Sequence, residues 1–208
     1  MDTDLLDRWN GLLDHPAAPA AGRDLLARWA EPHRRYHGLE HLREVLDRID
    51  ELRAEASDAD AVRLAAYFHD AVYDPASPAN EQRSARLAED VLPGLGVEPA
   101  RVLDVARLVR VTASHVPASA EDRDGAVLCD ADLAILAASP DDYAAYAAGV
   151  RAEYPHLDDP TFRAGRTDVL TSLLDRPQLF WTRSGRQRWE ERARQHLAAE
   201  RTLLRAAD

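Results

Sequence analysis

The sequence contains a single cysteine, Cys129, among 208 residues. One cysteine excludes an internal disulfide and a zinc site made of several thiolates, and it is typical of a reducing cytoplasm. Apolar runs long enough to cross a bilayer are absent, and the acidic N-terminus lacks the basic start and apolar core of a signal peptide. We therefore expect a cytoplasmic protein that does not associate with membranes.

Positive charge is also scarce, because 26 Lys and Arg residues face 37 Asp and Glu residues, for a net charge of −11. Such an acidic surface repels a phosphate backbone, which argues against general nucleic-acid binding. A small phosphorylated substrate is compatible with this charge if a metal or a local arginine cluster supplies positive charge. The sequence leaves the oligomeric state open.

β-Branched and aromatic residues are sparse, whereas alanine, leucine, arginine and glutamate dominate, which favours helix nearly everywhere. No useful strand pattern, repeat or interdomain linker is found. The sequence therefore predicts an all-α fold, a single compact bundle of about nine or ten helices that occupies residues 1–208. The predicted helices span residues 3–13, 19–30, 38–55, 58–73, 79–92, 98–113, 125–138, 140–153, 160–174 and 186–205.

The predicted helix 58–73 is apolar on nearly every side, which is typical of a central helix. It ends in the dipeptide His69-Asp70. Burying a carboxylate is costly unless the group is paired or coordinates an ion. We therefore expect a positive group to meet Asp70 at this end of the helix.

Three further histidines lie in the segment HRRYHGLEHL. His37 and His41 are four residues apart, which predicts that both rings share one helix face. This spacing alone is weak evidence for a metal or catalytic site, because histidines that are solvated or hydrogen-bonded within a core are more common. Together with His69 and Asp70, however, the segment offers nitrogen and oxygen ligands from two helices.

A further carboxylate is available in CDADLAIL, which otherwise reads as a buried helix. Asp130 and Asp132 lie about 200° apart on such a helix, so only one of them can face the same pocket. Imidazole and carboxylate ligands suit a divalent metal ion such as Mn, Fe, Co, Ni or Zn, and Mg is also accepted.

The pattern resembles the HD superfamily of metal-dependent phosphohydrolases, whose signature H…HD…D lies on a helical bundle. The matching residues are His41, His69, Asp70 and Asp132. YHGLEH is similar to the YHxxxH segment of cyclic-nucleotide phosphodiesterases, in which the first histidine is a general acid and the second a metal ligand. DLAIL resembles the segment of that branch that holds the last metal aspartate, which favours Asp132 over Asp130.

Other segments extend the resemblance to a bacterial group of predicted HD phosphohydrolases and cover most of the chain: FHDAVYDPASPANEQRSA, FRAGRTDVL and WEERARQHL. The resemblance implies a metal-binding core over about residues 30–140, with C-terminal helices 141–208 packed on it. Relatives with two metals add several histidines between the HD pair and the last aspartate, where this chain has only His115, so the resemblance favours one metal ion over two. His115 keeps two interpretations, a contact with a second ion or a phosphate, and a favourable interaction with a helix C-terminus.

The resemblance also implies roles in a hydrolytic reaction. Asp70 would accept a proton from a metal-activated water, and His37 would protonate the leaving alkoxide. A guanidinium group matches phosphate geometry, so Arg35, in preference to Arg34, is the predicted substrate ligand. The alternative for these arginines is a surface ion pair with an acid such as Glu31.

Asn80 and Glu81 fall in the first turn of the predicted helix 79–92, where the helix dipole favours an acid in any case. The resembled group has an Asn-Glu pair here. It implies that Glu81 steers a metal-bound water and that Asn80 contacts the substrate.

These observations predict a metal-dependent phosphohydrolase that cleaves a phosphate ester of a nucleotide or another small phosphorylated metabolite. One alternative is a metal-stabilised ligand-binding module without turnover. Another is a di-iron oxygenase of the same fold, which would need additional histidine ligands. The sequence contains no motif that identifies the substrate or the native metal.

Overall fold

The computed structural model of the chain describes residues 2–206, and within them it contains α-helices and short 3₁₀ helices but no strand. This confirms the predicted all-α fold. The helices are α1 (Thr3–Asn10), α2 (Ala18–Trp29), α3 (Leu39–Leu52), η1 (Arg53–Glu55), α4 (Ala59–Phe68), α5 (Asn80–Val91), η2 (Leu92–Leu95), α6 (Pro99–Val111), α7 (Arg123–Leu133), η3 (Ala134–Ala137), α8 (Pro140–Glu153), α9 (Asp159–Leu174), α10 (Arg183–Arg188) and α11 (Glu190–Ala206). None of the helices in residues 2–206 has both the length and the apolar character that a bilayer crossing requires.

Side-chain caps fix where many of these helices begin. Each capping residue accepts a hydrogen bond from a backbone N–H of the first turn, which satisfies a group that the helix leaves unpaired. The caps are Asp2, Asp58, Asp122, Ser139, Asp158 and Thr182. The helices therefore start at positions that the local sequence specifies.

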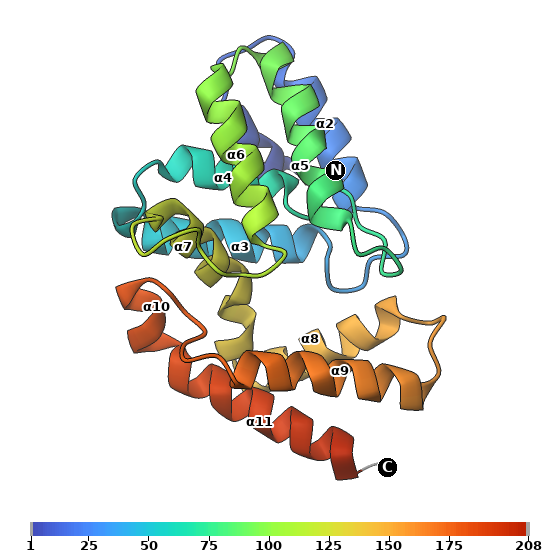
Figure 1. Ribbon diagram of the computed structural model, residues 1–208. Helices are drawn as coiled ribbons and strands as arrows, with labels where there is room; N and C mark the ends of the chain where they lie inside the picture. The colour runs from blue at the N-terminus through green and yellow to red at the C-terminus, as the bar shows by residue number, and fades with distance from the viewer. Residues whose placement is uncertain (1, 207–208) are drawn as a thin grey trace.

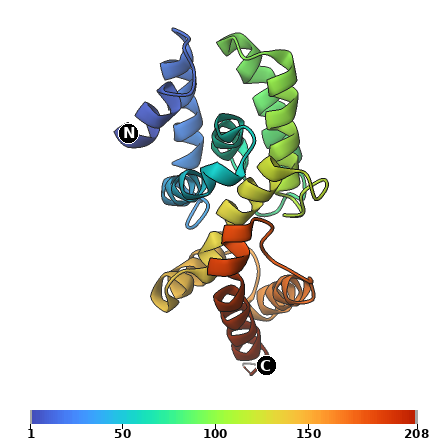
Figure 2. The ribbon, with the colours of Figure 1, turned by 90° about the vertical axis from the view of Figure 1, so that its left-hand side faces the viewer.

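Helix α4 is the central helix, as its apolar sequence predicted. Its residues from Ala61 to Phe68 are buried except Arg63, and it packs against α3, α5, α6 and α7. Figure 2 shows α4 with α1–α3 on one side and α5 and α6 on the other. The Tyr67 hydroxyl donates a hydrogen bond of 2.6 Å to the carbonyl of Leu5, which ties α4 to α1.

The chain is arranged in an upper and a lower part in Figure 1. Helices α1–α6 form the upper part, α8–α11 form the lower part, and α7 with η3 leads from one to the other. In the lower part, α11 packs against α9, α10 and η3. The end of α7 therefore lies where the two parts meet.

Two predicted helix boundaries are wrong for reasons of tertiary structure. The predicted helix 186–205 is broken between α10 and α11 at Trp189, which is buried and packs edge-on against Phe180 with ring centroids 5.5 Å apart. The predicted helix 58–73 ends at Phe68, after which the N–H of Ala71 bonds to the carbonyl of Phe68 in a turn and the carbonyl of Asp70 accepts from the Arg34 side chain. His69 and Asp70 therefore sit at the very end of the central helix.

Candidate metal centre

Four side chains from α3, α7 and the end of α4 converge next to the last residue of α4. His41 lies in the first turn of α3, His69 follows the last residue of α4, Asp70 is next to it, and Asp132 is near the end of α7. His41 Nε2 is 3.3 Å from His69 Nε2 and 3.2 Å from Asp132 Oδ1. His69 Nε2 is 3.5 Å from Asp70 Oδ2 and 3.7 Å from Asp132 Oδ1. The structure therefore brings together all four residues predicted as metal ligands.

The spacing of these atoms suits a shared ion. His41, His69 and Asp70 each offer one ligand atom, and these atoms lie within 4.8 Å of one another. Ligand atoms that share an ion through bonds of about 2.0–2.2 Å lie roughly 3 Å apart, which is close to the distances among the imidazole and carboxylate atoms here. The group could hold a metal ion.

The orientation of the His69 ring and the pKa shifts of His41 and Asp132 bear on metal binding by the cluster. His69 Nδ1 lies 2.8 Å from the carbonyl of Ala66, to which it can only donate, so Nε2 is the ring nitrogen that faces the other ligands. Burial lowers the pKa of His41, which favours its neutral form. Burial alone would raise the pKa of Asp132, but His69, His115 and His41 outweigh it and hold that pKa well below its ordinary value. Neutral imidazoles and an ionised carboxylate are the forms that bind metals.

His37 reaches this cluster in a different way from the one predicted. Helix α3 begins at Leu39, and Gly38 before it has an extended backbone with φ −121° and ψ −165°. His37 therefore lies in the preceding loop, and the predicted helix face shared by His37 and His41 is wrong. The two rings are nevertheless close, with centroids 5.6 Å apart.

Glu153, at the end of α8, holds this loop in place. One carboxylate oxygen accepts hydrogen bonds from the backbone N–H groups of Arg35, Tyr36 and His37 at 2.7, 2.8 and 2.9 Å. The other oxygen lies 2.6 Å from His37 Nδ1 and accepts from the Tyr73 hydroxyl at 2.8 Å. The Glu153 side chain is fully buried. Glu153 therefore satisfies three backbone N–H groups of the loop and connects the loop to the end of α8.

The His37–Glu153 pair shifts both pKa values. Burial alone would lower the pKa of His37, but the hydrogen bond to Glu153 and the charge of Asp70 outweigh it and raise that pKa. Burial alone would raise the pKa of Glu153, but His37 and the backbone donors lower it to about 2. At neutral pH the pair therefore contains an ionised carboxylate and an imidazole with an increased tendency to be protonated.

Sequence reasoning assigned no role to Glu153. A signal was present, because Glu153 follows Val150 by three positions and Tyr146 by seven, a spacing that places all three on one face of α8. Tyr146 and Val150 on that face are residue types that commonly pack in a core at helical spacing. An acid on such a face requires partners, although the sequence could not identify them.

His115 and Asp130 have distinct positions around Asp132. His115 Nε2 is 2.8 Å from Asp132 Oδ2, so His115 contacts a candidate ligand and lies past the end of α6. Its backbone has φ 51°, an uncommon conformation that His adopts more readily than most residues. Asp130 points away from the cluster and accepts hydrogen bonds from the backbone of Trp181 and Thr182. The preference for Asp132 over Asp130 agrees with this geometry.

The two arginines of the loop also differ from expectation. Arg34 is buried and donates to the carbonyls of His37 and Asp70 at 2.9 and 2.8 Å, and it pairs with Glu31 at 3.2 Å. Arg35 is exposed and lines a separate cavity that contains none of the four candidate ligands. The structure thus corrects the prediction for Arg35, whose backbone N–H donates to Glu153 while its side chain lies outside the metal cavity.

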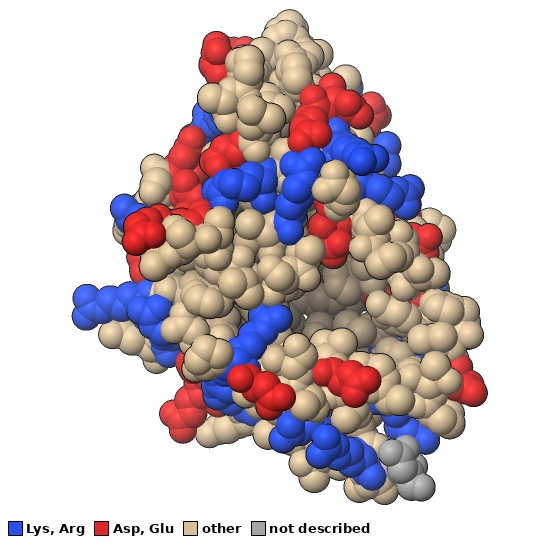
Figure 3. Space-filling view, viewed as in Figure 1, with Lys and Arg blue, Asp and Glu red and all other residues tan. Residues whose placement is uncertain are grey.

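A cavity of about 390 Å³ opens beside three of the candidate ligands, His69, Asp70 and Asp132. The surface in Figure 3 is hollowed between the upper helices and α9, where this cavity lies. Its lining includes the predicted site residues His37, His69, Asp70, Asn80, Glu81, His115 and Asp132. The Asn80 amide is engaged with the backbone of Asp74, accepting at 3.1 Å and donating at 2.9 Å. Asn80 therefore shapes the turn before α5, and Glu81 is the half-buried acid that this turn presents to the cavity.

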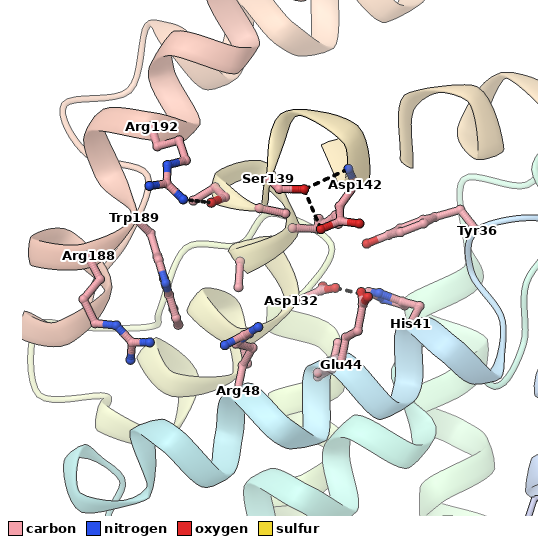
Figure 4. A pocket seen from close by; sticks show the side chains of 16 residues that line it. Tyr36, His41, Glu44, Arg48, Asp132, Ser139, Asp142, Arg188, Trp189 and Arg192 are labelled. Atoms are coloured by element: carbon pink, nitrogen blue, oxygen red, sulfur yellow. Dashed lines mark hydrogen bonds and ion pairs between the residues drawn. The ribbon is translucent and has the colours of Figure 1, made fainter. Parts of the chain in front are cut away.

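A second cavity, of about 540 Å³, lies on the other side of His41 and Asp132. Figure 4 shows His41 and Asp132 pointing toward each other, with Glu44 beside them and Arg48 farther along α3. His37, His69 and Asp70 do not line this second cavity. The cavity of about 390 Å³ is therefore the one that combines the ligands with His37.

No family model matches the chain, and searches of curated proteins and solved structures find no significant match. The functional interpretation therefore depends on the residues and their geometry.

The donor set fits a divalent ion. Two imidazoles and two carboxylates are hard or borderline ligands that suit Mn, Fe, Co, Ni, Zn or Mg. The exposed fractions of the four side chains are small, at 3% for His41, 1% for His69, 13% for Asp70 and 12% for Asp132. Burial of two carboxylates beside the same two imidazoles is costly unless positive charge compensates them, and a divalent ion would supply that charge.

Proposed function

We propose that the protein is a metal-dependent phosphohydrolase that cleaves a phosphate ester of a nucleotide or another small metabolite. His41, His69, Asp70 and Asp132 would hold one divalent ion. When bound, such an ion supplies activation of a water molecule and withdrawal of charge from a phosphoryl oxygen. The motif resemblance to HD phosphohydrolases supports the same assignment.

The observation that carries the proposal is the His37–Glu153 pair on the wall of the same cavity. Glu153 is bound to Nδ1 of His37, so the proton of Nε2 is the one available for transfer. The raised pKa of His37 increases its protonated fraction at neutral pH. A protonated imidazole beside the ester bond would donate a proton to the leaving oxygen.

The acids of the cavity would handle the other proton. Asp70 lies at the edge of the cluster with 13% of its side chain exposed, and Glu81 faces the cavity from the start of α5. Either carboxylate can accept a proton from an attacking water or orient that water. In the proposed reaction, Asp70 accepts the proton from the water, and Glu81 orients that water.

The proposed reaction accounts for His37 better than the alternatives do. A binding module without turnover needs no imidazole that is fixed by a buried carboxylate beside the metal ligands. A di-iron oxygenase needs further histidine ligands. Between Asp70 and Asp132 the chain has only His115, which is engaged with Asp132.

The test is phosphate release by purified protein supplied in turn with Mn, Fe, Co, Ni, Zn and Mg. Both an aryl ester, p-nitrophenyl phosphate, and an alkyl ester, ethyl phosphate, would be used. We expect His37→Ala to retain metal and to slow hydrolysis of the alkyl ester by about 10²–10⁴-fold. Hydrolysis of the aryl ester should slow less, because its leaving group needs less protonation. His156→Ala, an exposed histidine outside the cavity, is the control.

Two results would count against the proposal. Lack of phosphate release from every ester with every metal would overturn the hydrolase assignment. Equal rates for His37→Ala and the unmodified protein on ethyl phosphate would remove His37 from the reaction.

A further inference from the structure

A groove between α8 and α9 continues from the metal cavity. It has a volume of about 380 Å³, and we refer to it as the α8–α9 groove. The residues that define it are Tyr146, Val150 and Tyr154 on one side and Phe162, Gly165 and Val169 on the other. Each set follows a spacing of three or four residues, so each side of the groove is mainly one helix face.

The groove and the metal cavity share a wall. His37, Tyr146, Tyr154 and Val169 line both of them. His37 therefore stands at the border, with the candidate ligands on one side and the groove on the other. If the leaving oxygen of a phosphate ester lies at His37, the alcohol part of the ester lies at the entrance to the α8–α9 groove.

The groove offers apolar surface but little uncompensated charge. Its one arginine, Arg166, donates two hydrogen bonds to Glu200 at 2.8 and 3.0 Å and lies 5.1 Å from the Tyr146 ring centroid. His37 is likewise paired, with Glu153. Val169 is 51% exposed although it is aliphatic. Such a lining suits an uncharged apolar group.

Gly165 keeps the groove open. It lies inside α9, where glycine is less favourable than alanine by roughly 0.5–1 kcal/mol. A Cβ atom added at Gly165 would meet no atom within 4 Å, so close packing does not explain the glycine. Its absent side chain leaves room between Phe162 and Val169.

We propose that the α8–α9 groove binds the uncharged alkyl or aryl part of the phosphate ester. The inference rests on the proposed hydrolase function and specifies its substrate class as esters of apolar alcohols. Specificity would come from burial of apolar carbon in the groove.

The test compares linear alkyl phosphates from ethyl to hexyl. Their leaving alcohols have similar acidity, so a change in kcat/KM along the series reports contact with the alkyl chain. We expect kcat/KM to rise with chain length, by up to about fourfold for each methylene that becomes fully buried. A non-hydrolysable series, ethylphosphonate to hexylphosphonate, would give Kd values for the Mn-loaded protein by calorimetry.

Two substitutions block the groove in different ways. Gly165→Leu adds bulk where open space exists and improves helix propensity, and Val169→Glu places a charge on an exposed position of the wall. Either should lower the hexyl-to-ethyl ratio of kcat/KM, and of phosphonate affinity, by about tenfold or more. The matched controls are Gly94→Leu, which also has no atom within 4 Å, and Leu103→Glu, which is 65% exposed on α6.

The outcomes separate the two proposals. Equal affinity for ethylphosphonate and hexylphosphonate would overturn the groove proposal, as would unchanged chain-length dependence in both Gly165→Leu and Val169→Glu. Lack of phosphate release from all esters would instead overturn the proposed function. Chain-length dependence that both substitutions abolish and both controls retain is the result we expect.

Discussion

Replacing Glu153 by glutamine should destabilise the protein in a pH-dependent way. The substitution keeps the size of the side chain and an oxygen that can accept from the N–H groups of Arg35, Tyr36 and His37. It removes the negative charge that faces His37 and an acceptor for the Tyr73 hydroxyl. The effect therefore measures the charged part of this buried network.

The magnitude follows from the pKa of Glu153. That pKa is about 2 in the folded protein, against an ordinary value of 4.5. Burial alone would raise this pKa. The pKa falls because His37 supplies a hydrogen bond and positive charge and because backbone N–H groups donate to the carboxylate. Since a tenfold change in an equilibrium constant is worth about 1.4 kcal/mol, the difference corresponds to about 3 kcal/mol of folding free energy.

The pH dependence has a defined sign. The pKa of Glu153 is lower in the folded protein, so its stabilisation is present above about pH 4.5 and is lost as the pH falls toward about 2. The pKa of His37 is raised above its ordinary 6.5, so the stabilisation that depends on its charge is present below pH 6.5 and is lost as the pH rises through the folded value. The pair should stabilise most between these limits.

The assay is urea denaturation of the metal-free protein and of Glu153→Gln, with EDTA present. We expect a loss of about 3 kcal/mol near pH 5.5 and a smaller loss near pH 3 and pH 9. The exposed Glu191→Gln should change the free energy of unfolding by less than about 0.5 kcal/mol. A loss below about 1 kcal/mol near pH 5.5, or an equal loss at all three pH values, would refute the reasoning.

Two further substitutions test how the site is supported. Arg34→Met removes donors from the carbonyls of His37 and Asp70, and it should lower the free energy of unfolding by about 2–4 kcal/mol in chemical denaturation; an effect below about 0.5 kcal/mol would contradict this role. His115→Asn removes the imidazole that contacts Asp132 Oδ2, and asparagine tolerates the left-handed backbone at this position. The substitution should weaken Mn²⁺ binding by about 10–100-fold in calorimetry. Unchanged affinity would mean that His115 does not support the ligand.

Local sequence information predicted much of the fold, because periodicity indicates the helices within a few turns and side-chain caps fix the start of six of them. The opposite directions of Asp130 and Asp132 also followed from helix geometry alone. The break at Trp189 could not be predicted in this way, because it accompanies packing against Phe180. WEERARQHL by itself has a continuous helical pattern.

The candidate site shows the same limit. The importance of Asp70 could be recognised from the sequence, because a carboxylate at the end of an apolar helix requires compensation. The position of His37 depends on Glu153, which is 116 residues away in the sequence. Spacing alone suggested that His37 would extend α3, whereas the distant carboxylate and the extended backbone of Gly38 place it in a loop.

Metal binding by the cluster tests the central claim most directly. After removal of metals and titration with Mn²⁺, we expect about one ion per unmodified chain, with a higher Tm in its presence. His69→Ala and Asp70→Ala should each abolish stoichiometric binding and the rise in Tm. Full metal occupancy in both variants, measured by elemental analysis, would contradict the assignment of these residues as ligands.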